Sequence, residues 1–286
     1  MGIGLREHIA SLAAVFIALT VGILIGVSLS RQEPLEKRMA TLSKQFEGLR
    51  RENRDLRDRT LALERHLRAR GEFDGPLLPS LVAGRLTGLL VATVWVGDFG
   101  QVRFEEDLGA TLALAGARVV GSLALAPGFP SQVRESKAPA ILGESPSEPE
   151  AAARVLERVG SLAGAGLWSD LEPLAQIGLL TLSGELTGKP RVVTVVTCLA
   201  KEDSAQTALL LPHLVEGLRQ SAQFVLAAEP SVAPVSAIGV YRRAGVTTVD
   251  NIDTIPGQVA AVWALAARAE GAFGIKDTAQ ALSPKI

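Results

Sequence analysis

The residues best suited to chemistry are polar side chains that follow short apolar runs, where the chain leaves a predicted strand. Such positions fall at 97–98, 201–203, 229 and 250–253. In an open parallel sheet, ligands bind in the crevice outside the carboxyl ends of the strands. The segment 250–253 is the most polar of these ends, and its oxygens could hold a ligand. The candidate crevice residues are therefore Asp98, Asp250, Asn251 and Asp253.

A structural interpretation of the same residues competes with ligand binding. Asp253 or Thr254 has the side chain of a good helix N-cap, and Pro256 follows at a position typical of a first helical turn. Asp98 follows Gly97, and this pair is typical of a turn. The sequence favours the N-cap and the turn over ligand binding.

Other groups offer little catalytic or metal chemistry. Cys198 is the only cysteine, lies in an apolar run and is expected to be a buried, inert thiol. His213 lies in a helical stretch without an acidic or cysteine partner at ligand spacing, which indicates a structural or surface histidine. The chain lacks a phosphate-binding loop, a dinucleotide-binding fingerprint and a serine nucleophile elbow. We therefore expect no enzyme activity, no cofactor and no metal site.

The strand ends are positioned by apolar runs that alternate with helical patterns from residue 89 onward. This alternation is typical of a parallel sheet covered by helices on both faces. Residues 126–148, rich in Pro, Ser and Glu, are predicted to be a loop. The fold class is therefore α/β, with a doubly wound, Rossmann-like or flavodoxin-like domain at 89–286. Strands are predicted at 89–96, 118–125, 191–199, 223–228 and 247–250, and helices at 103–115, 149–163, 168–177, 204–220, 234–244 and 256–269.

An uncharged run of 21 residues, at positions 9–29, precedes this domain. As a helix it spans about 31 Å, close to the thickness of the hydrocarbon core of a membrane. We predict a single-pass transmembrane anchor at residues 1–30, and the alternative is a secretory signal peptide cleaved near residues 28–30. Small residues at every fourth position would let two such helices pack closely in lipid: Ala14, Ala18, Gly22 and Gly26.

Leucine recurs at every seventh residue from 35 to 63, a spacing that specifies a left-handed coiled coil. Leucine at d and the polar Asn53 at one a position suit a parallel homodimer. The alternative is a single amphipathic helix packed on its own domain. We predict a coiled coil at 31–70, ended by the glycines and proline of a hinge and short helix at 71–88. The predicted dimer contacts are Leu35, Met39, Leu42, Phe46, Leu49, Asn53, Leu56, Thr60, Leu63 and Leu67.

Composition and charge indicate which kinds of partner the protein binds. The net charge of −1 combines +5 over residues 31–70 (12 basic, 7 acidic) with −6 over residues 71–286 (16 basic, 22 acidic). Aromatic residues make up only 4%, which argues against the stacking surface of a single-stranded nucleic-acid-binding protein. The basic surplus fits a solvated coil face, or contact with anionic lipid headgroups if the coil is cytoplasmic. Nucleic acid is therefore not an expected partner, whereas a second copy and the bilayer are.

Three motifs resemble one known family. They are R-x-H-I-x-S-L-x-A-V-F-x-A-L-x-x-G-x-x-x-G at residues 6–26, T-V-D-N-I-D-T at 248–254, and G-A-F-G at 271–274. They resemble the copper transporter MctB family. The resemblance implies a membrane-associated protein that limits copper accumulation in the cell, with its coil and α/β domain outside the cytoplasm. Copper is implied by this resemblance alone.

Two hypotheses about function follow, and a weaker third is an enzyme that uses the crevice at the strand ends. The first is copper homeostasis in the cell envelope by a membrane-anchored dimer. The second is a membrane-anchored coiled-coil scaffold that binds an envelope protein and transports no metal directly. Scarcity of soft ligands for cuprous ion favours the second, because beyond residue 70 the chain holds only Cys198 and His213. By the positive-inside rule the domain would stay in the cytoplasm, opposite to the resemblance, because basic residues follow the span: Arg31, Lys37, Arg38 and Lys44.

Overall fold

The computed structural model describes residues 4–99, 104–135, 138–143, 150–199 and 204–285. The chain divides into two compact units, residues 1–70 and 71–286. Within helices, the side chains of residues 4–6, 29–38, 40, 70, 104, 134–135 and 204 lie outside this description, and Leu35 of the predicted dimer contacts is among them. The predicted strand end at 201–203 also lies outside the described residues.

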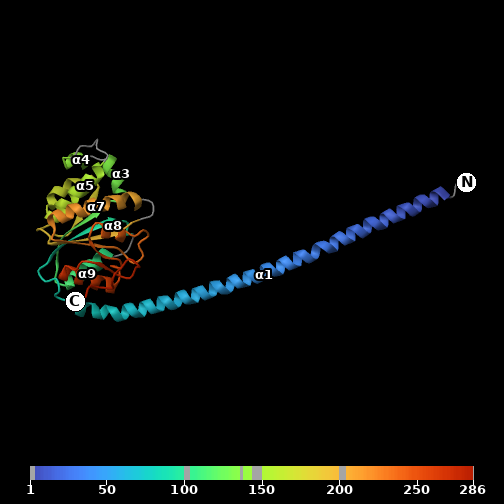
Figure 1. Cartoon of the computed structure of the whole chain (residues 1–286), viewed down its shortest axis with the longest axis horizontal. Helices are drawn as coiled ribbons and strands as arrows, with labels where there is room; N and C mark the ends of the chain where they lie inside the picture. The colour runs from blue at the N-terminus through green and yellow to red at the C-terminus, as the bar shows by residue number, and fades with distance from the viewer. Residues whose placement is uncertain (1–3, 100–103, 136–137, 144–149, 200–203, 286) are drawn as a thin grey trace. The chain divides into compact units, whose positions relative to one another are not determined.

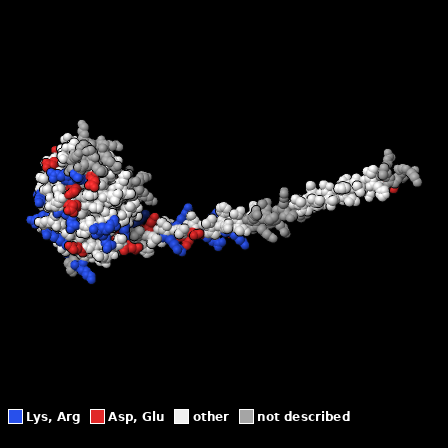
Figure 2. All heavy atoms as spheres, turned by 45° about the horizontal axis from the view of Figure 1, so that its top comes forward, with Lys and Arg blue, Asp and Glu red and all other residues white. Residues whose placement is uncertain are grey.

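The described part of the first unit belongs to one helix, α1 (Gly4–Val82). Its stretch Glu7–Ser28 has a mean hydropathy of 2.5 over 22 residues, and it is long and apolar enough to cross a membrane. Farther along α1, Lys, Arg, Asp and Glu side chains gather (Figure 2). The described leucines at d are exposed there, from Leu42 at 52% to Leu63 at 63%. The coiled coil, which needs a second chain to cover these leucines, stays a prediction.

The helix end predicted at residues 70–71 is wrong, because α1 continues past Gly71 and Pro76 to Val82. Tertiary contacts explain the difference. Val82 is fully buried in the apolar core of the second unit, and the indole Nε1 of Trp263 donates to the Leu81 carbonyl at 3.0 Å. These contacts outweigh the cost of a helical glycine, which is about 1 kcal/mol. The chain then turns through residues 83–88.

The second unit is built on a seven-stranded sheet in the order β3-β2-β1-β4-β5-β6-β7. Every pair of neighbours is parallel except β2 and β3. Strands β1 and β4 are buried along nearly their whole length, which explains why they read as continuous apolar runs. The bounds are β1 Leu90–Gly97, β2 Arg118–Leu125, β3 Leu180–Ser183, β4 Val192–Cys198, β5 Phe224–Ala228, β6 Thr247–Val249 and β7 Ala272–Phe273.

Helices cover both faces of this sheet (Figure 1). Alternate residues of β1 face opposite ways, so that Val94 joins the apolar cluster of one face and Trp95 the cluster of the other. On the Trp95 face lie the last turns of α1, α2 (Phe104–Leu114) and α9 (Ile255–Ala267). The Val94 face is covered by α3 Phe129–Glu135, α4 Ala138–Ile141, α5 Ala151–Ala165, the 3-10 helix Trp168–Leu171, α6 Glu172–Gln176, α7 Ser204–Ser221 and α8 Ile238–Arg243. The predicted α/β class is therefore confirmed.

Several short elements differ from the sequence prediction. The predicted loop 126–148 contains α3 and α4, because Phe129 and Val133 form an apolar side that is buried against the core. Strands β3 and β7 were not predicted. Strand β3 is a four-residue antiparallel edge strand and β7 has two residues, so neither has a long apolar run. Each strand forms because it pairs with a neighbour, β3 with β2 and β7 with β6.

Candidate functional site

A cavity of about 250 Å³ opens at the carboxyl ends of β1, β2 and β4. It lies where the strand order reverses, because β2 lies on one side of β1 and β4 on the other. At the end of β1, Gly97 has φ +106°, and a Cβ there would lie 2.0 Å from the Cys198 carbonyl oxygen. Only glycine permits this close approach. Side chains on the cavity wall include Asp98, Leu125, Phe129, Leu156, Leu199, Thr207 and Leu210.

Of the four predicted crevice residues, the structure places Asp98 on this cavity wall. The backbone N–H of Asp98 donates to the Cys198 carbonyl at 3.0 Å, which joins the ends of β1 and β4. The other three follow β6 and do not line the cavity. Asp250 is 1% exposed and accepts hydrogen bonds from the backbone N–H groups of Ile275, at 2.7 Å, and Lys276, at 3.1 Å. This carboxylate therefore fixes the segment after β7.

The remaining two residues hold the entry to α9. Thr254 is the N-cap, since its hydroxyl accepts from the Gly257 N–H at 3.2 Å, and the predicted cap is confirmed there. Asn251 supports the cap by donating from Nδ2 to the Thr254 hydroxyl at 3.0 Å. Asp253 accepts from both the N–H and the hydroxyl of Ser231, at 2.7 Å and 2.6 Å. Both polar side chains thus hold loops together.

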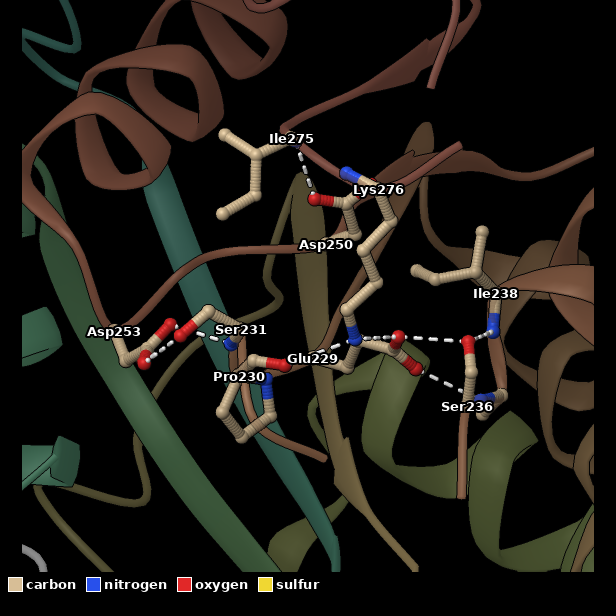
Figure 3. A network of polar contacts seen from close by, with 10 residues as sticks. Glu229, Pro230, Ser231, Ser236, Ile238, Asp250, Asp253, Ile275 and Lys276 are labelled. Carbon is tan, nitrogen blue, oxygen red and sulfur yellow. Dashed lines mark hydrogen bonds and ion pairs between the residues drawn. The ribbon is translucent and has the colours of Figure 1, made fainter. Parts of the chain in front are cut away.

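A buried ion pair that the sequence did not predict lies beside these loops (Figure 3). Glu229, at the end of β5, is 1% exposed and pairs with Lys276, whose side chain is 23% exposed. The same carboxylate accepts from the Ser236 hydroxyl and the Ala237 N–H, each at 2.7 Å, and Lys276 also donates to the Pro230 carbonyl at 3.1 Å. The only sequence signal was an acidic residue directly after an apolar strand. Its partner is 47 residues away.

The charges at this edge of the sheet act on the single thiol. Burial raises the pKa of Cys198, and the carboxylates of Asp98, Glu229 and Asp253 raise it further, whereas Lys276 lowers it. The thiol is half-buried instead of fully buried as expected. Because the thiolate is the nucleophile and the metal ligand, this environment makes Cys198 a poor nucleophile and a poor ligand for soft metals.

Two other titratable side chains, Tyr241 and His213, lie in the core and on the surface respectively. Tyr241 is fully buried, its hydroxyl shares a hydrogen bond with that of Thr197, and burial raises the pKa of the phenol well above its ordinary value. His213 lies on the exposed side of α7, as a surface histidine would. Within the described ranges, no group of three or more His, Cys, Asp or Glu side chains is arranged to hold a metal ion.

We predict that Lys276→Met destabilises the domain by about 2 kcal/mol, because it leaves the Glu229 carboxylate buried with only two neutral donors. Chemical unfolding of the full chain in detergent measures this loss. Adding Glu229→Gln should recover at least part of it, because the buried negative charge is removed. Lys285→Met, at an exposed position, is the matched control. Equal stability of the Lys276→Met chain and the wild type would contradict the structural role of the pair.

We predict that iodoacetamide alkylates Cys198 in the folded chain with a midpoint at higher pH than in the urea-unfolded chain. The reason is that burial and three carboxylates disfavour the thiolate. Asp98→Asn removes one of these charges and should move the midpoint to lower pH, whereas Asp170→Asn, at an exposed position, should leave it unchanged. Since the chain has one cysteine, total alkylation reports this site alone. A folded midpoint at or below the unfolded one would refute the assignment.

Both units of the chain match one family of known proteins. The family described as "Copper transport outer membrane protein, MctB" matches residues 2–284. The proteins named "Copper transporter MctB" from Mycobacterium bovis and Mycobacterium tuberculosis are each 25% identical to this chain over 303 residues. The alignments cover 92% of this chain and 92% of each relative. The resemblance carried by the terminal motifs is confirmed, and the chain belongs to the MctB family.

Proposed function

We propose that this protein acts in copper homeostasis as a membrane-anchored dimer that limits copper accumulation in the cell. The observation that carries the proposal is the family match over residues 2–284, which includes both the apolar helix and the α/β domain. The relatives are named copper transporters and the family is described as an outer membrane protein. Location in the cell envelope, with the α/β domain outside the cytoplasm, belongs to the same proposal.

The proposed role is indirect, because the chain has poor means of conducting copper itself. A single helix cannot enclose a pore, and the stretch Glu7–Ser28 carries no charged side chain after Glu7. Cuprous ion prefers soft ligands, and the only thiol, Cys198, lies where carboxylates and burial disfavour its thiolate. We therefore propose that the protein supports copper export through a partner protein of the envelope, without catalysis and without a bound cofactor.

The α/β domain is the proposed partner-binding or ligand-binding part. Its parallel strands run in the order β2-β1-β4-β5-β6, which corresponds to the 2-1-3-4-5 order of flavodoxin-like, doubly wound folds. In such folds ligands bind where the order reverses, and the cavity with Asp98 on its wall lies at that point. This coincidence supports the cavity as the recognition site of the domain.

Dimerisation is proposed from the heptads of the first unit. Ten seam positions recur from residue 35 to residue 67, and the described leucines among them are exposed on α1. A parallel dimer would cover them, and Asn53 would fix its register. In the membrane, the small residues Ala14, Ala18, Gly22 and Gly26 would support the same pairing, since small side chains let two helix backbones approach closely in lipid.

The alternative is a scaffold that binds an envelope protein and has no part in copper handling. Burial and the neighbouring carboxylates raise the pKa of Cys198, which disfavours direct metal ligation by the thiolate. This favours the alternative. In that case the fold, the anchor and the dimer would be unchanged, and only the effect on copper would differ. Copper measurements in cells therefore separate the two functions.

We predict that cells lacking this protein accumulate more copper in copper-supplemented medium, and that the full chain restores the wild-type level. Mass spectrometry of washed cells measures copper, with zinc in the same samples as the control metal. Unchanged copper in the deletion strain would leave the scaffold as the function.

We predict that titration of the full chain in nanodiscs with cuprous ion and a competing chelator shows no tight stoichiometric binding. Tight binding would contradict the indirect role.

We predict that Asn53→Cys, in a Cys198→Ser chain, forms a disulfide-linked dimer under mild oxidation, because a positions of a parallel coil face each other across the seam. Arg54→Cys, at the outward b position, is the matched control and should form far less dimer. Non-reducing electrophoresis of membranes measures both. Equal cross-linking of the two variants would refute the parallel register.

A further inference from the structure

The cavity at the carboxyl ends of β1, β2 and β4 has a largely apolar wall. Its large apolar side chains come from strand ends and from helices on the Val94 face: Leu125, Phe129, Leu156, Leu199 and Leu210. The first four are each at most 5% exposed, so they present little surface except to the cavity. Removing apolar surface from water is favourable, and this wall therefore favours a ligand with an apolar body.

Hydrogen bonds fix the segment that closes one side of the cavity. The Ala126 N–H donates to the Leu179 carbonyl at 3.0 Å, and the Phe129 N–H donates to the Ala126 carbonyl at 3.1 Å. The Gln132 side-chain amide donates to the Pro127 carbonyl at 2.9 Å. The cavity is therefore preformed, as sites for small molecules usually are.

The size of the cavity limits the ligand. Its volume of about 250 Å³ is below the range of about 300–1,000 Å³ that is typical of sites for drug-sized ligands. A nucleotide would exceed this space, whereas a single ring or a short alkyl chain with one polar group would fit within it.

The polar groups on the wall indicate what that polar group is. Among the described residues that line the cavity, Asp98 is the charged one. A carboxylate can accept several hydrogen bonds at once, so Asp98 can receive an ammonium group beside any contact within the chain. The hydroxyl of Thr207, half-buried on α7, adds a second polar partner.

Charges near the cavity have the same sign. Cys198 adjoins the cavity, because its carbonyl accepts from the Asp98 N–H at 3.0 Å. Burial raises the pKa of its thiol, and the carboxylates of Asp98, Glu229 and Asp253 raise it further. Only Lys276 acts in the opposite direction among the named charges. Three negative charges against one positive charge make this end of the sheet attractive to cations and repulsive to anions.

We propose that the cavity binds a small organic cation, a primary ammonium group on a short apolar body. The ammonium lies at Asp98, and the apolar body packs against Phe129 and the leucines of the wall. This inference rests on the proposed role of the cavity as the recognition site of the domain, and it names the class of ligand. A phosphate or carboxylate would lie beside a like charge and is excluded, unlike the phosphate-bearing ligands of many doubly wound folds.

The test uses the full chain in nanodiscs and three probes that share one phenyl ring. They are 2-phenylethylamine, which is cationic at neutral pH, the uncharged 2-phenylethanol, and the anion 3-phenylpropionate. Saturation-transfer NMR titration measures each dissociation constant, and empty nanodiscs correct for partition into lipid. We expect the amine to bind at least about tenfold more tightly than the carboxylate, with the alcohol between them.

Two variants locate the binding in this cavity. Asp98→Asn, which keeps the size of the side chain, should weaken binding of the amine by about tenfold and leave binding of the alcohol nearly unchanged. Asp170→Asn, at an exposed position, is its matched control. Thr207→Phe should fill the cavity and abolish binding of both probes, whereas His213→Phe, on the exposed side of the same helix, should have no effect. Circular dichroism verifies the fold of each variant.

The outcomes separate this inference from the proposal on which it rests. Equal or tighter binding of the carboxylate overturns the preference for a cation, while the cavity remains a binding site. Amine binding that Asp98→Asn leaves unchanged also overturns the inference, because the charge is then recognised elsewhere. If Thr207→Phe does not fold, Asp98→Asn decides alone. Binding of none of the probes overturns both the inference and the recognition role of the cavity, and the copper content of cells tests the copper role independently.

Discussion

Burial of the sheet on both faces is the constraint on which the rest of the domain depends. When helices cover both sides, a strand interior has no place for a charged group, so polar side chains collect where strands end. Asp98, Glu229 and Asp250 follow the last residues of β1, β5 and β6 for this reason. The same constraint brings them to one edge, because parallel strands end on the same side.

These carboxylates are then satisfied in different ways, with different chemical results. Asp250 accepts two backbone N–H groups, and Glu229 pairs with Lys276 and the start of α8, so both are committed to holding the C-terminal segment. Asp98 instead lies on the wall of the cavity where the strand order reverses. Burial raises the pKa of the neighbouring Cys198, and the carboxylates of Asp98, Glu229 and Asp253 raise it further. Recognition by shape and polarity therefore suits this edge better than thiolate chemistry.

The last turns of α1 belong to the α/β domain. Val82 is buried in the apolar core of this unit, and Asp74, Leu77 and Leu81 line a groove beside α9. The hydrogen bond from the Trp263 indole to the Leu81 carbonyl holds these turns against α9.

Much of the architecture was determined by local sequence. Apolar runs and helical periodicity located the strand at 118–125 to the residue, the principal helices and the α/β class, because these patterns reflect burial of each element by itself. The Thr254 cap was equally local, since its partners are three residues away. The apolar span was evident from hydropathy, and the family from motifs at both ends. Only tertiary structure decided the rest. The pairing of Glu229 with Lys276, the strands β3 and β7, and the passage of α1 through Gly71 and Pro76 all depend on residues distant in sequence. These features are stabilised by contacts between residues that only the folded sheet brings together. A local sequence pattern does not indicate which distant residues those are.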